Sequence, residues 1–378
     1  FRKMKWAGIS EDSILASFER PVKMRIFSWD GEKDTIMTPF DSIMYYKSLL
    51  RSGFMAMDPK KGHVKAYVGG INFKHFQYDH VSQGKNQAGS TFKPFLYILA
   101  MEEGYSPCYK VRNVAQTFYV LDTVWQPRSA GKKEDYGRLV TLKWGLATSE
   151  NNISAWLLKK FNPESIVKVA HDMGIKSKID AVPSMIYGTS DVSVWEMVSA
   201  YSSFANKGVH IEPIFVTRIE DKHGNKLFES SKKITEAISE QTAYLMLNLM
   251  QGVVDGGTAS SLRYRYGLEG EIAGKTGTTN NHSDGWFMGV TQNLVGGCWV
   301  GGEDRPIRFD NIVQGQGAHM ALPIWALFMQ KVYADSSLKI HPVPFDSPVN
   351  INMNLNCRFY DEKENVDSPD NYIERDSW

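Results

Sequence analysis

The chain has 378 residues, of which 42% are hydrophobic and 22% are charged. This is an ordinary globular composition, and the length suffices for one large domain or two smaller ones. The 43 basic residues are nearly balanced by 42 acidic residues, and no dense block of lysine and arginine occurs. The charge therefore argues against a nucleic-acid-binding protein and leaves the substrate open.

The three cysteines, Cys108, Cys298 and Cys357, are odd in number and widely scattered. We therefore expect no disulfide framework and predict buried free thiols. The nine histidines show no His-Glu-x-x-His motif and no spacing typical of zinc ligands. The sequence thus predicts no metal and no cofactor.

No apolar run approaches the roughly 18 residues that a membrane-spanning helix needs. The chain begins at Phe1 with neither an initiator methionine nor a signal peptide. We therefore expect a piece of a longer protein, and the missing membrane segment says little about where the parent protein resides.

The first 50 residues are mixed and polar, with a strand-like run at 22–27 before the turn Asp30-Gly31. They are predicted to form a linker or a small β-rich segment. Next, the apolar-rich stretches 54–57 and 63–68 flank a turn with the sequence Asp58-Pro59-Lys60-Lys61-Gly62. This pattern indicates a β-hairpin.

A glycine-containing loop at 84–89 then leads to Ser90. Apolar residues at helical spacing follow, and Gly104 supplies a stop signal, so Ser90 is predicted at the N-terminus of a helix. Pro94 lies near the first turn of this helix, where proline is tolerated.

The pattern from about 140 to 260 is mainly helical. One predicted helix carries apolar residues from Val194 to Phe204 on one face and ends at 206–208, and another follows the capping residue Ser239. The segments 286–290 and 294–300 are candidate antiparallel strands.

A last helix is expected at 320–332, followed by a partly disordered tail at 336–378. Strands, then a helical block, then strands and a closing helix predict an α/β domain at 51–335. We expect a central antiparallel sheet built from both ends of this domain, flanked by helices and a mainly helical subdomain.

Ser90-Thr91-Phe92-Lys93 is the first motif with chemical content. Residues three apart on a helix share a face, so the Lys93 amine can reach the Ser90 hydroxyl and serve as its base. The helix N-terminus adds free N–H groups where an oxyanion would form. The pattern alone is weak, because five other Ser-x-x-Lys pairs occur: Ser82/Lys85, Ser129/Lys132, Ser165/Lys168, Ser230/Lys233 and Ser336/Lys339. Ser90 differs because a glycine loop precedes it and an apolar helix follows, which would bury its lysine.

Ser149-Glu150-Asn151 is the only Ser-x-Asn in the chain, and it falls between two helical stretches. A hydroxyl there can relay a proton, and the asparagine amide can hold a substrate amide and a lysine. Taken alone, the triplet is equally typical of a helix cap.

Lys275-Thr276-Gly277-Thr278 follows on a strand-like segment that begins at Ile272. Gly277 would let a substrate backbone lie close to the strand. Lys275 would attract an anionic substrate and would lower the pKa of a neighbouring Lys93, which favours the neutral base. A phosphate-binding loop is the rival interpretation, but it requires glycine at 269, where the chain has Glu269.

These three motifs occur in the order expected of the penicillin-recognising serine enzymes. Their surroundings resemble the transpeptidase domain of bifunctional class A penicillin-binding proteins, of the penicillin-binding protein 1A type, over roughly residues 35–335. The stretches that carry the resemblance are 54–59, 89–94, 188–193, 201–208, 256–259 and 274–279.

The resemblance implies a penicillin-binding/β-lactamase-like fold and a D,D-transpeptidase that cross-links peptidoglycan stem peptides and is a target of β-lactams. It implies that Ser90 is the acylated nucleophile, Lys93 its base, and Ser149, Asn151 and Lys275 the proton-transfer and placement network. Thr276, Gly277 and Thr278 would line the substrate site, with the two threonines binding its carboxylate. The backbone N–H groups of Ser90 and Thr278 would form the oxyanion hole.

The resemblance also implies partners and a location. The donor would be a D-Ala-D-Ala peptide and the acceptor an amine on a neighbouring strand. The full-length protein would carry an upstream glycosyltransferase domain and a membrane anchor, which would tether it to the inner membrane on the periplasmic side. Both are absent from this sequence, so we expect it to lack polymerase activity. Asn86-Gln87-Ala88 stands where many relatives have Arg-Gln-Pro, which should alter the loop rather than the chemistry.

Several alternatives stay open at this stage. A serine β-lactamase shares the three motifs but needs a base for deacylation, and Glu150 and Asp191 are candidates without a committing spacing. A β-lactam sensor, a peptidoglycan-binding module or a D,D-carboxypeptidase that uses water as acceptor are also compatible with the residues. Acceptor choice and stem-peptide chemistry do not follow from the sequence.

Overall fold

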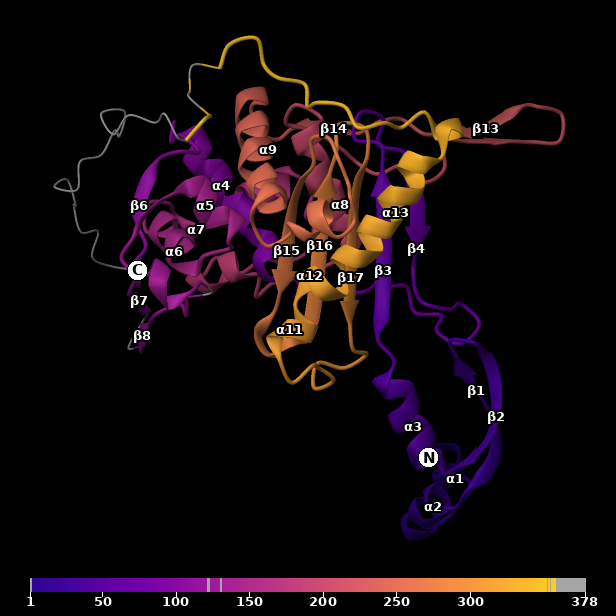
Figure 1. The fold of residues 1–378 in the computed structure, drawn as a ribbon. Coiled ribbons are helices and arrows are strands. Elements are labelled where there is room, and N and C mark those ends of the chain that lie inside the picture. Colours follow the sequence, from indigo (N-terminus) through magenta and orange to yellow (C-terminus); the bar gives the residue numbers. More distant parts are fainter. Residues whose placement is uncertain (1, 121–122, 130, 352, 354, 358–378) are drawn as a thin grey trace.

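The computed structural model describes residues 2–120, 123–129, 131–351, 353 and 355–357. A five-stranded antiparallel sheet forms its centre, in the order β15-β16-β17-β3-β4 (Figure 1). Strands β3 (Arg51–Met57) and β4 (Val64–Val68) come from the first part of the chain, and β15 (Ala273–Thr278), β16 (Asp284–Val290) and β17 (Val295–Gly301) come from the last.

The prediction that strands from both ends of the domain share one sheet is confirmed. β17 pairs with β3 along its whole length, from Val295 opposite Met57 to Gly301 opposite Arg51. The hairpin expected around the turn at 58–62 is the β3–β4 pair. All residues of β16 and β17 are buried, which is typical of strands covered on both faces.

Helices cover both faces of this sheet. The helices α12 (Gly317–Met320) and α13 (Leu322–Ala334) lie on one face, and α8 (Val194–Ala205) and α9 (Glu240–Asp255) lie on the other (Figure 1). Trp325 of α13 packs over Gly289 and Gly296, which are partners in β16 and β17. A Cβ atom at Gly289 would lie 2.3 Å from the Trp325 ring, so this glycine makes room for the indole.

The cap expected at Ser239 is confirmed, and α8 begins with a capping box that was not predicted. Ser193 and Glu196 form a capping box at the start of α8, and the Ser239 side chain accepts a hydrogen bond from the backbone N–H of Thr242 in α9. These caps satisfy backbone donors that would otherwise be left unpaired at the helix ends.

A mainly helical subdomain lies beside the β15 edge of the sheet (Figure 1). Its helices are α4 (Lys93–Glu102), α5 (Leu142–Ala147), α6 (Asn151–Leu158) and α7 (Pro163–Asp172), with the small strand pairs β6 (Lys110–Arg112) with β9 (Leu139–Thr141) and β7 (Phe118–Val120) with β8 (Thr123–Trp125). The remaining short elements are β5 (Asn86–Gln87), β10 (Asp191–Val192), α10 (Ser261–Tyr264), α11 (Ile312–Gly315) and five 3₁₀ turns: Gly89–Phe92, Lys133–Asp135, Pro183–Tyr187, Asn280–His282 and Ser336–Leu338.

The helical prediction for 140–260 was too broad. Besides β10, the strands that interrupt it include β11 (Val209–Ile211), which pairs with β14 (Ile234–Glu236), and β12 (Arg218–Glu220), which pairs with β13 (Lys226–Glu229). The β12–β13 hairpin projects from the body of the molecule (Figure 1). Its turn is held by Asp221, whose carboxylate accepts the backbone N–H groups of His223 and Asn225.

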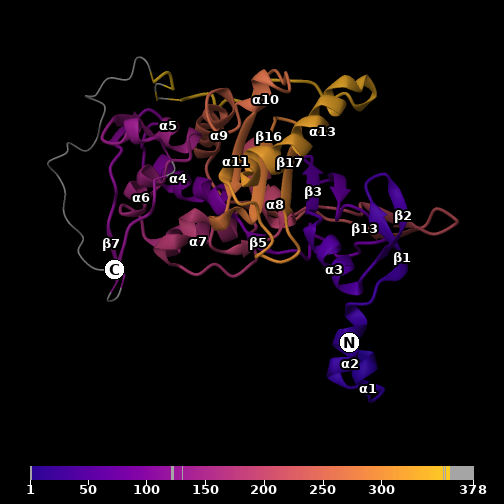
Figure 2. The same cartoon turned by 60° about the horizontal axis from the view of Figure 1, so that its bottom comes forward.

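Residues 2–48 lie apart from the main sheet (Figures 1 and 2). They form α1 (Arg2–Trp6), α2 (Glu11–Phe18), the antiparallel pair β1 (Val22–Ser28) and β2 (Gly31–Met37), and α3 (Pro39–Ser48). Ion pairs from Lys47 and Arg51 to Glu303 connect the junction of this region to the segment after β17.

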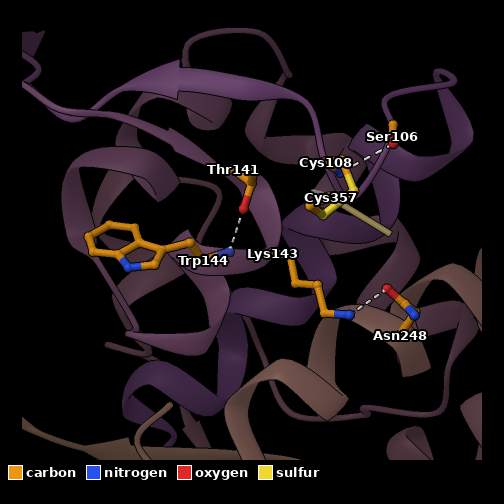
Figure 3. The surroundings of a disulfide bond; sticks show 7 residues. All are labelled: Ser106, Cys108, Thr141, Lys143, Trp144, Asn248 and Cys357. Atoms are coloured by element: carbon orange, nitrogen blue, oxygen red, sulfur yellow. Dashed lines mark hydrogen bonds between the residues drawn. A yellow bond between two sulfur atoms is a disulfide. The ribbon is translucent and has the colours of Figure 1, made fainter. Parts of the chain in front are cut away.

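The cysteine prediction was wrong for two of the three residues. Cys108 and Cys357 form a disulfide bond, although 249 residues separate them, and only Cys298 is a buried free thiol. After α13 the chain runs back over the molecule to the helical subdomain, where Cys357 meets Cys108 (Figures 1 and 3). Sequence spacing gave no signal of this pairing, because the fold alone brings the two ends together. The tail predicted beyond residue 357 lies outside the described residues.

Breaking this cross-link should loosen the returning segment. Asp346 is still held by hydrogen bonds to Gln292 and an ion pair to Lys60, whereas the disulfide anchors the chain beyond it. We expect Cys357→Ser to increase amide hydrogen exchange in residues 347–351, because cross-links over long loops stabilise by about 2–4 kcal/mol. The measurement is hydrogen exchange followed by mass spectrometry.

A matched control is Cys298→Ala, which removes a thiol that forms no disulfide and should leave exchange in 347–351 unchanged. Reducing agent should reproduce the Cys357→Ser result in the native chain. Equal exchange with and without the cross-link would contradict the expectation.

Candidate active site

Ser90 lies in the 3₁₀ turn Gly89–Phe92, which leads directly into α4. The backbone N–H of Lys93 donates to the carbonyl of Ser90, so one turn separates the two residues and their side chains share a face. Ser90 is half-buried, and its hydroxyl has no hydrogen-bond partner among the described residues. The hydroxyl is therefore available to a substrate.

Close backbone packing fixes this turn. The Gly89 N–H donates to the Gly188 carbonyl at 3.1 Å, and the Ala88 N–H donates to the Ser190 carbonyl at 3.2 Å. Gly188 has φ +72°, and a Cβ atom there would lie 2.1 Å from the Gly89 backbone. Only glycine fits such an approach at a positive φ. The segment 188–193 is one of the stretches that carry the family resemblance, and its backbone packs against the serine turn and holds it.

Gly277 has a packing role that was not predicted. A Cβ atom at this position would lie 2.8 Å from the Ala88 carbonyl oxygen and 2.9 Å from a methyl group of Thr91. The glycine therefore admits the serine turn against β15, and its expected contact with a substrate backbone stays a prediction. Gly89 in turn lies against the backbone of Thr278, so the Ser90 and Thr278 backbones are brought together.

Lys93 is completely buried, as its position on an apolar helix predicted. Its Nζ donates to the Asn151 Oδ1 at 2.6 Å and to the Ser149 carbonyl at 2.5 Å, and it lies 3.3 Å from the Ser149 Oγ. The first and second motifs are therefore in direct contact. Within the described part of the chain, no hydrogen bond joins the Lys93 Nζ to the Ser90 hydroxyl, although this contact was expected.

Lys275 reaches the same hydroxyl from the sheet side. It is also completely buried, and its Nζ donates to the Ser149 Oγ at 3.0 Å and to the Thr276 carbonyl at 3.0 Å. Ser149 thus stands between two lysine amines, with a left-handed backbone (φ 60°) that aims the side chain there. A hydroxyl has two lone pairs and one proton, so it can accept from both amines and still donate its own proton.

Burial depresses the pKa of both lysines. It lowers the pKa of Lys93 to about 7, while the Glu150 carboxylate acts in the opposite direction. Burial also lowers the pKa of Lys275 well below its ordinary value, and the nearby Lys93 lowers it further. The direction at Lys93 agrees with the expectation, but its cause is burial and not Lys275. A substantial neutral fraction of Lys93 is therefore present near pH 7.

Glu150, which the sequence suggested only as a possible deacylation base, is a structural part of this site. It is completely buried, caps α6 through the N–H of Asn152, and accepts a hydrogen bond from the Ser129 hydroxyl at 3.0 Å. The Asn151 Nδ2 donates to the Arg128 carbonyl at 2.7 Å. The segment around 128–129 is thereby attached to the Ser-x-Asn loop. The one sequence signal for this role of Glu150 was its position directly before α6, where a capping residue is expected.

The threonines of β15 already have partners. The Thr276 and Thr258 hydroxyls share a hydrogen bond of 2.6 Å, and the Thr278 Oγ1 accepts the Gly317 N–H at 3.1 Å. β15 is the edge strand of the sheet and lies on the side of the helical subdomain, so the two threonines lie at that edge. Gly317 was not predicted, because its contact depends on how α12 packs on the sheet.

The other Ser-x-x-Lys pairs do not form comparable clusters in the described part of the chain. Lys168 pairs with Asp172, Lys233 pairs with Glu212, and Ser129 contacts Glu150. Among the described residues, no group of three or more His, Cys, Asp or Glu side chains could hold a metal ion, and no helix is long and apolar enough to cross a membrane.

Comparisons with known proteins agree with this geometry. The model of the penicillin-binding protein transpeptidase domain matches residues 52–295, and that of the penicillin-binding protein middle domain matches residues 1–50. The chain therefore belongs to the penicillin-binding protein transpeptidase family, whose members are extracytoplasmic enzymes of cell-wall synthesis.

Two curated relatives show how much of a larger protein is matched. Penicillin-binding protein 2D of Bacillus subtilis is 32% identical over 290 residues, which cover 74% of this chain and 41% of that protein. Penicillin-binding protein 1A of Aquifex aeolicus is 30% identical over 312 residues, which cover 81% of this chain and 41% of that protein. The chain thus spans about 41% of the length of these relatives.

Solved structures support the fold. Penicillin-binding protein 1A from Haemophilus influenzae matches with a TM-score of 0.69 at 24% identity, covering 78% of this chain and 49% of that one. The PonA1 protein from Mycobacterium tuberculosis in complex with penicillin V matches with a TM-score of 0.65 at 22% identity, covering 92% of this chain and 94% of that one. The predicted fold class is confirmed.

The depressed pKa of Lys93 should make stability depend on pH. Between pH 7.5 and 8.5 the unfolded chain holds a proton on this lysine and the folded chain mostly does not, so stability rises with pH. Over that unit, the native chain should gain about 1 kcal/mol more unfolding free energy than Lys93→Met. Chemical denaturation at both pH values measures it, and equal gains in the two proteins would refute the buried, neutral lysine.

Proposed function

We propose that this chain is a serine D,D-transpeptidase that cross-links peptidoglycan stem peptides through an acyl-enzyme at Ser90. The observation that carries the proposal is the Ser149 hydroxyl held between the buried amines of Lys93 and Lys275, beside a serine turn packed on β15. Family membership supports a peptidoglycan substrate and β-lactam binding, and the site supports the particular chemistry.

The proposed reaction begins with attack of the Ser90 Oγ on the carbonyl carbon between the two terminal D-Ala residues. Neutral Lys93 takes the serine proton, and the N–H groups of Ser90 and Thr278 stabilise the oxyanion. The leaving D-Ala amine then receives a proton, for which the Ser149 hydroxyl, between both lysines, is the relay. An amine on a neighbouring strand then attacks the acyl carbon, the ester bond to the Ser90 Oγ breaks as the new amide forms, and the proton that the amine loses returns to the Ser90 Oγ through Lys93.

In this scheme Asn151 places Lys93, since its Oδ1 is already used by that amine. Lys275 supplies positive charge, and Thr276 and Thr278 bind the donor's terminal carboxylate. In the full-length protein the domain would act beside a glycosyltransferase domain and be tethered to the inner membrane on the periplasmic side, as the resemblance implies.

A β-lactamase activity finds no support among the two candidate bases. Glu150 is completely buried, and its carboxylate is engaged by Ser129 and Asn152. Asp191 is exposed and ion-paired to Arg305. Neither carboxylate is free to activate water at the acyl-enzyme, so slow deacylation is the expected behaviour. Release of D-Ala from a donor peptide without an added amine would mark the D,D-carboxypeptidase reaction, in which water is the acceptor.

The first test is covalent labelling. Incubation with benzylpenicillin should add one drug mass to the intact chain, and the adduct should persist for hours. Ser90→Ala should abolish it, whereas Ser82→Ala, at another Ser-x-x-Lys pair, should label normally. Intact mass spectrometry reads the result, and an adduct that survives Ser90→Ala would overturn the assignment.

A second test follows from the pKa of Lys93. The acylation rate should rise from pH 6 to 8 with a midpoint of about 7, because the base must be neutral. Lys93→Arg retains a cation but provides no neutral base, and should slow acylation by about 10²–10⁴-fold. Acylation is followed with a fluorescent penicillin, and a rate independent of pH across this range would exclude Lys93 as the base.

A further inference from the structure

One stretch that carries the family resemblance, Gly256-Gly257-Thr258-Ala259, has no part in the reaction proposed above. It joins the C-terminal end of α9 to α10. Ala259 is buried and Thr258 is half-buried, and the Thr258 hydroxyl is the only polar side-chain group in the stretch. What the stretch can do therefore depends on the neighbours of this threonine.

The backbone of Thr258 lies against the segment that leads to the Ser-x-Asn loop. Its N–H donates to the carbonyl of Ala147, the last residue of α5, at 3.0 Å. A Cβ atom at Gly257 would lie 2.2 Å from the same carbonyl oxygen, so this close approach requires glycine. Ala147 precedes Ser149 by two positions. Thr258 is therefore fixed beside one of the proposed catalytic segments.

The side chain of Thr258 reaches a second catalytic segment. Its hydroxyl shares a hydrogen bond of 2.6 Å with the Thr276 hydroxyl, and either oxygen can be the donor. Thr276 directly follows Lys275 on β15, and the Lys275 amine donates to the Ser149 hydroxyl. Thr258 thus connects the two segments, with its backbone on the Ser-x-Asn side and its hydroxyl on the Lys-Thr-Gly side.

The pair of hydroxyls has one proton to spare. Each hydroxyl carries one proton and two acceptor lone pairs, and their mutual hydrogen bond uses only one of the two protons. Neither the Thr258 nor the Thr276 hydroxyl has another hydrogen-bond partner within the described part of the chain. One hydroxyl proton is therefore available to an acceptor on a ligand.

The direction of the shared hydrogen bond decides which oxygen offers this proton. If Thr258 donates, the spare proton is on Thr276, on the same face of β15 as Thr278, because strand residues two apart point the same way. The Thr278 Oγ1 accepts the Gly317 N–H, and its own proton has no acceptor among the described residues. Two donors then share one face of the strand. An anion that accepts from Thr276 also makes this hydroxyl a better acceptor, which favours donation by Thr258.

We propose that Thr258 is a positioning residue for anion recognition: its hydroxyl donates to Thr276, which leaves the Thr276 proton for a carboxylate on the ligand. The inference rests on the proposed function, in which Thr276 and Thr278 bind the donor's terminal carboxylate, and it names the group that orients one of these donors. Hydrogen bonds to charged acceptors are stronger than those between neutral groups, so a donor oriented in advance favours an anionic ligand over a neutral one.

The test compares benzylpenicillin with its methyl ester, which lacks the negative charge. The rate of Ser90 acylation by each compound is followed by intact mass spectrometry, and the ratio of the two rates is the anion preference. Thr258→Val keeps nearly the same side-chain shape but removes the hydroxyl, and should lower this preference about three- to tenfold, mainly by slowing the acid. Thr258→Ser keeps the hydroxyl and should retain the native preference.

Further variants separate positioning from direct contact with the ligand. Thr276→Val should lower the anion preference at least as much as Thr258→Val. Adding Thr258→Val to Thr276→Val should lower it no further, because Thr258 acts through Thr276. As a matched control, Thr217→Val makes the same chemical change at an exposed position before β12 and should leave both rates unchanged.

An unchanged preference in Thr258→Val, or an equal slowing of acid and ester in that variant, would overturn the positioning role. So would a further loss in the double variant, or equal rates for acid and ester in the native chain. Failure of benzylpenicillin to label Ser90 of the native chain would instead overturn the proposed function. The two failures are therefore distinguishable in one set of rates.

Discussion

The site depends on two lysine amines buried around one serine hydroxyl. Taking a cation out of water is costly, and the cost is offset only when acceptors surround it. Here the acceptors are neutral: the carbonyls of Ser149 and Thr276, the Asn151 amide and the Ser149 hydroxyl. Neutral acceptors satisfy the amines without restoring the charged form as fully as a carboxylate would. The result is a lysine whose pKa falls to about 7 inside a folded protein.

Three glycines allow the close backbone packing that places the serine turn in this site. Gly188, Gly89 and Gly277 lie where the serine turn is enclosed between segment 188–193 and strand β15, and a Cβ atom on any of them would meet backbone at 2.1 to 2.9 Å. Main-chain contacts therefore position the serine together with side chains such as Tyr201, whose hydroxyl donates to the Thr91 carbonyl at 2.6 Å. A turn fixed in this way holds its N–H groups in place before substrate arrives, which is the condition for electrostatic preorganisation.

Much of this could be predicted from the sequence, because local signals and global fold agree. Helical spacing after Ser90, the cap at Ser239 and the hairpin turn at 58–62 all correspond to elements in the structure. What escaped prediction depends on contacts between distant segments. The Cys108–Cys357 bond, the burial of Glu150 and the Thr278–Gly317 contact each join parts of the chain whose proximity no local pattern encodes. The packing of Gly277 against the serine turn was missed for the same reason, since its neighbours Ala88 and Thr91 are far away in sequence.

The disulfide also closes a covalent loop in the chain, from Cys108 to Cys357. The loop from Cys108 to Cys357 contains the Ser-x-Asn and Lys-Thr-Gly motifs, while Ser90 and Lys93 lie on the arm that precedes it. A single peptide cleavage inside that loop, for instance in the projecting β12–β13 hairpin, would therefore leave the two fragments joined through sulfur. The nucleophile and the groups that act on it would stay on one covalently connected molecule until the bond was reduced.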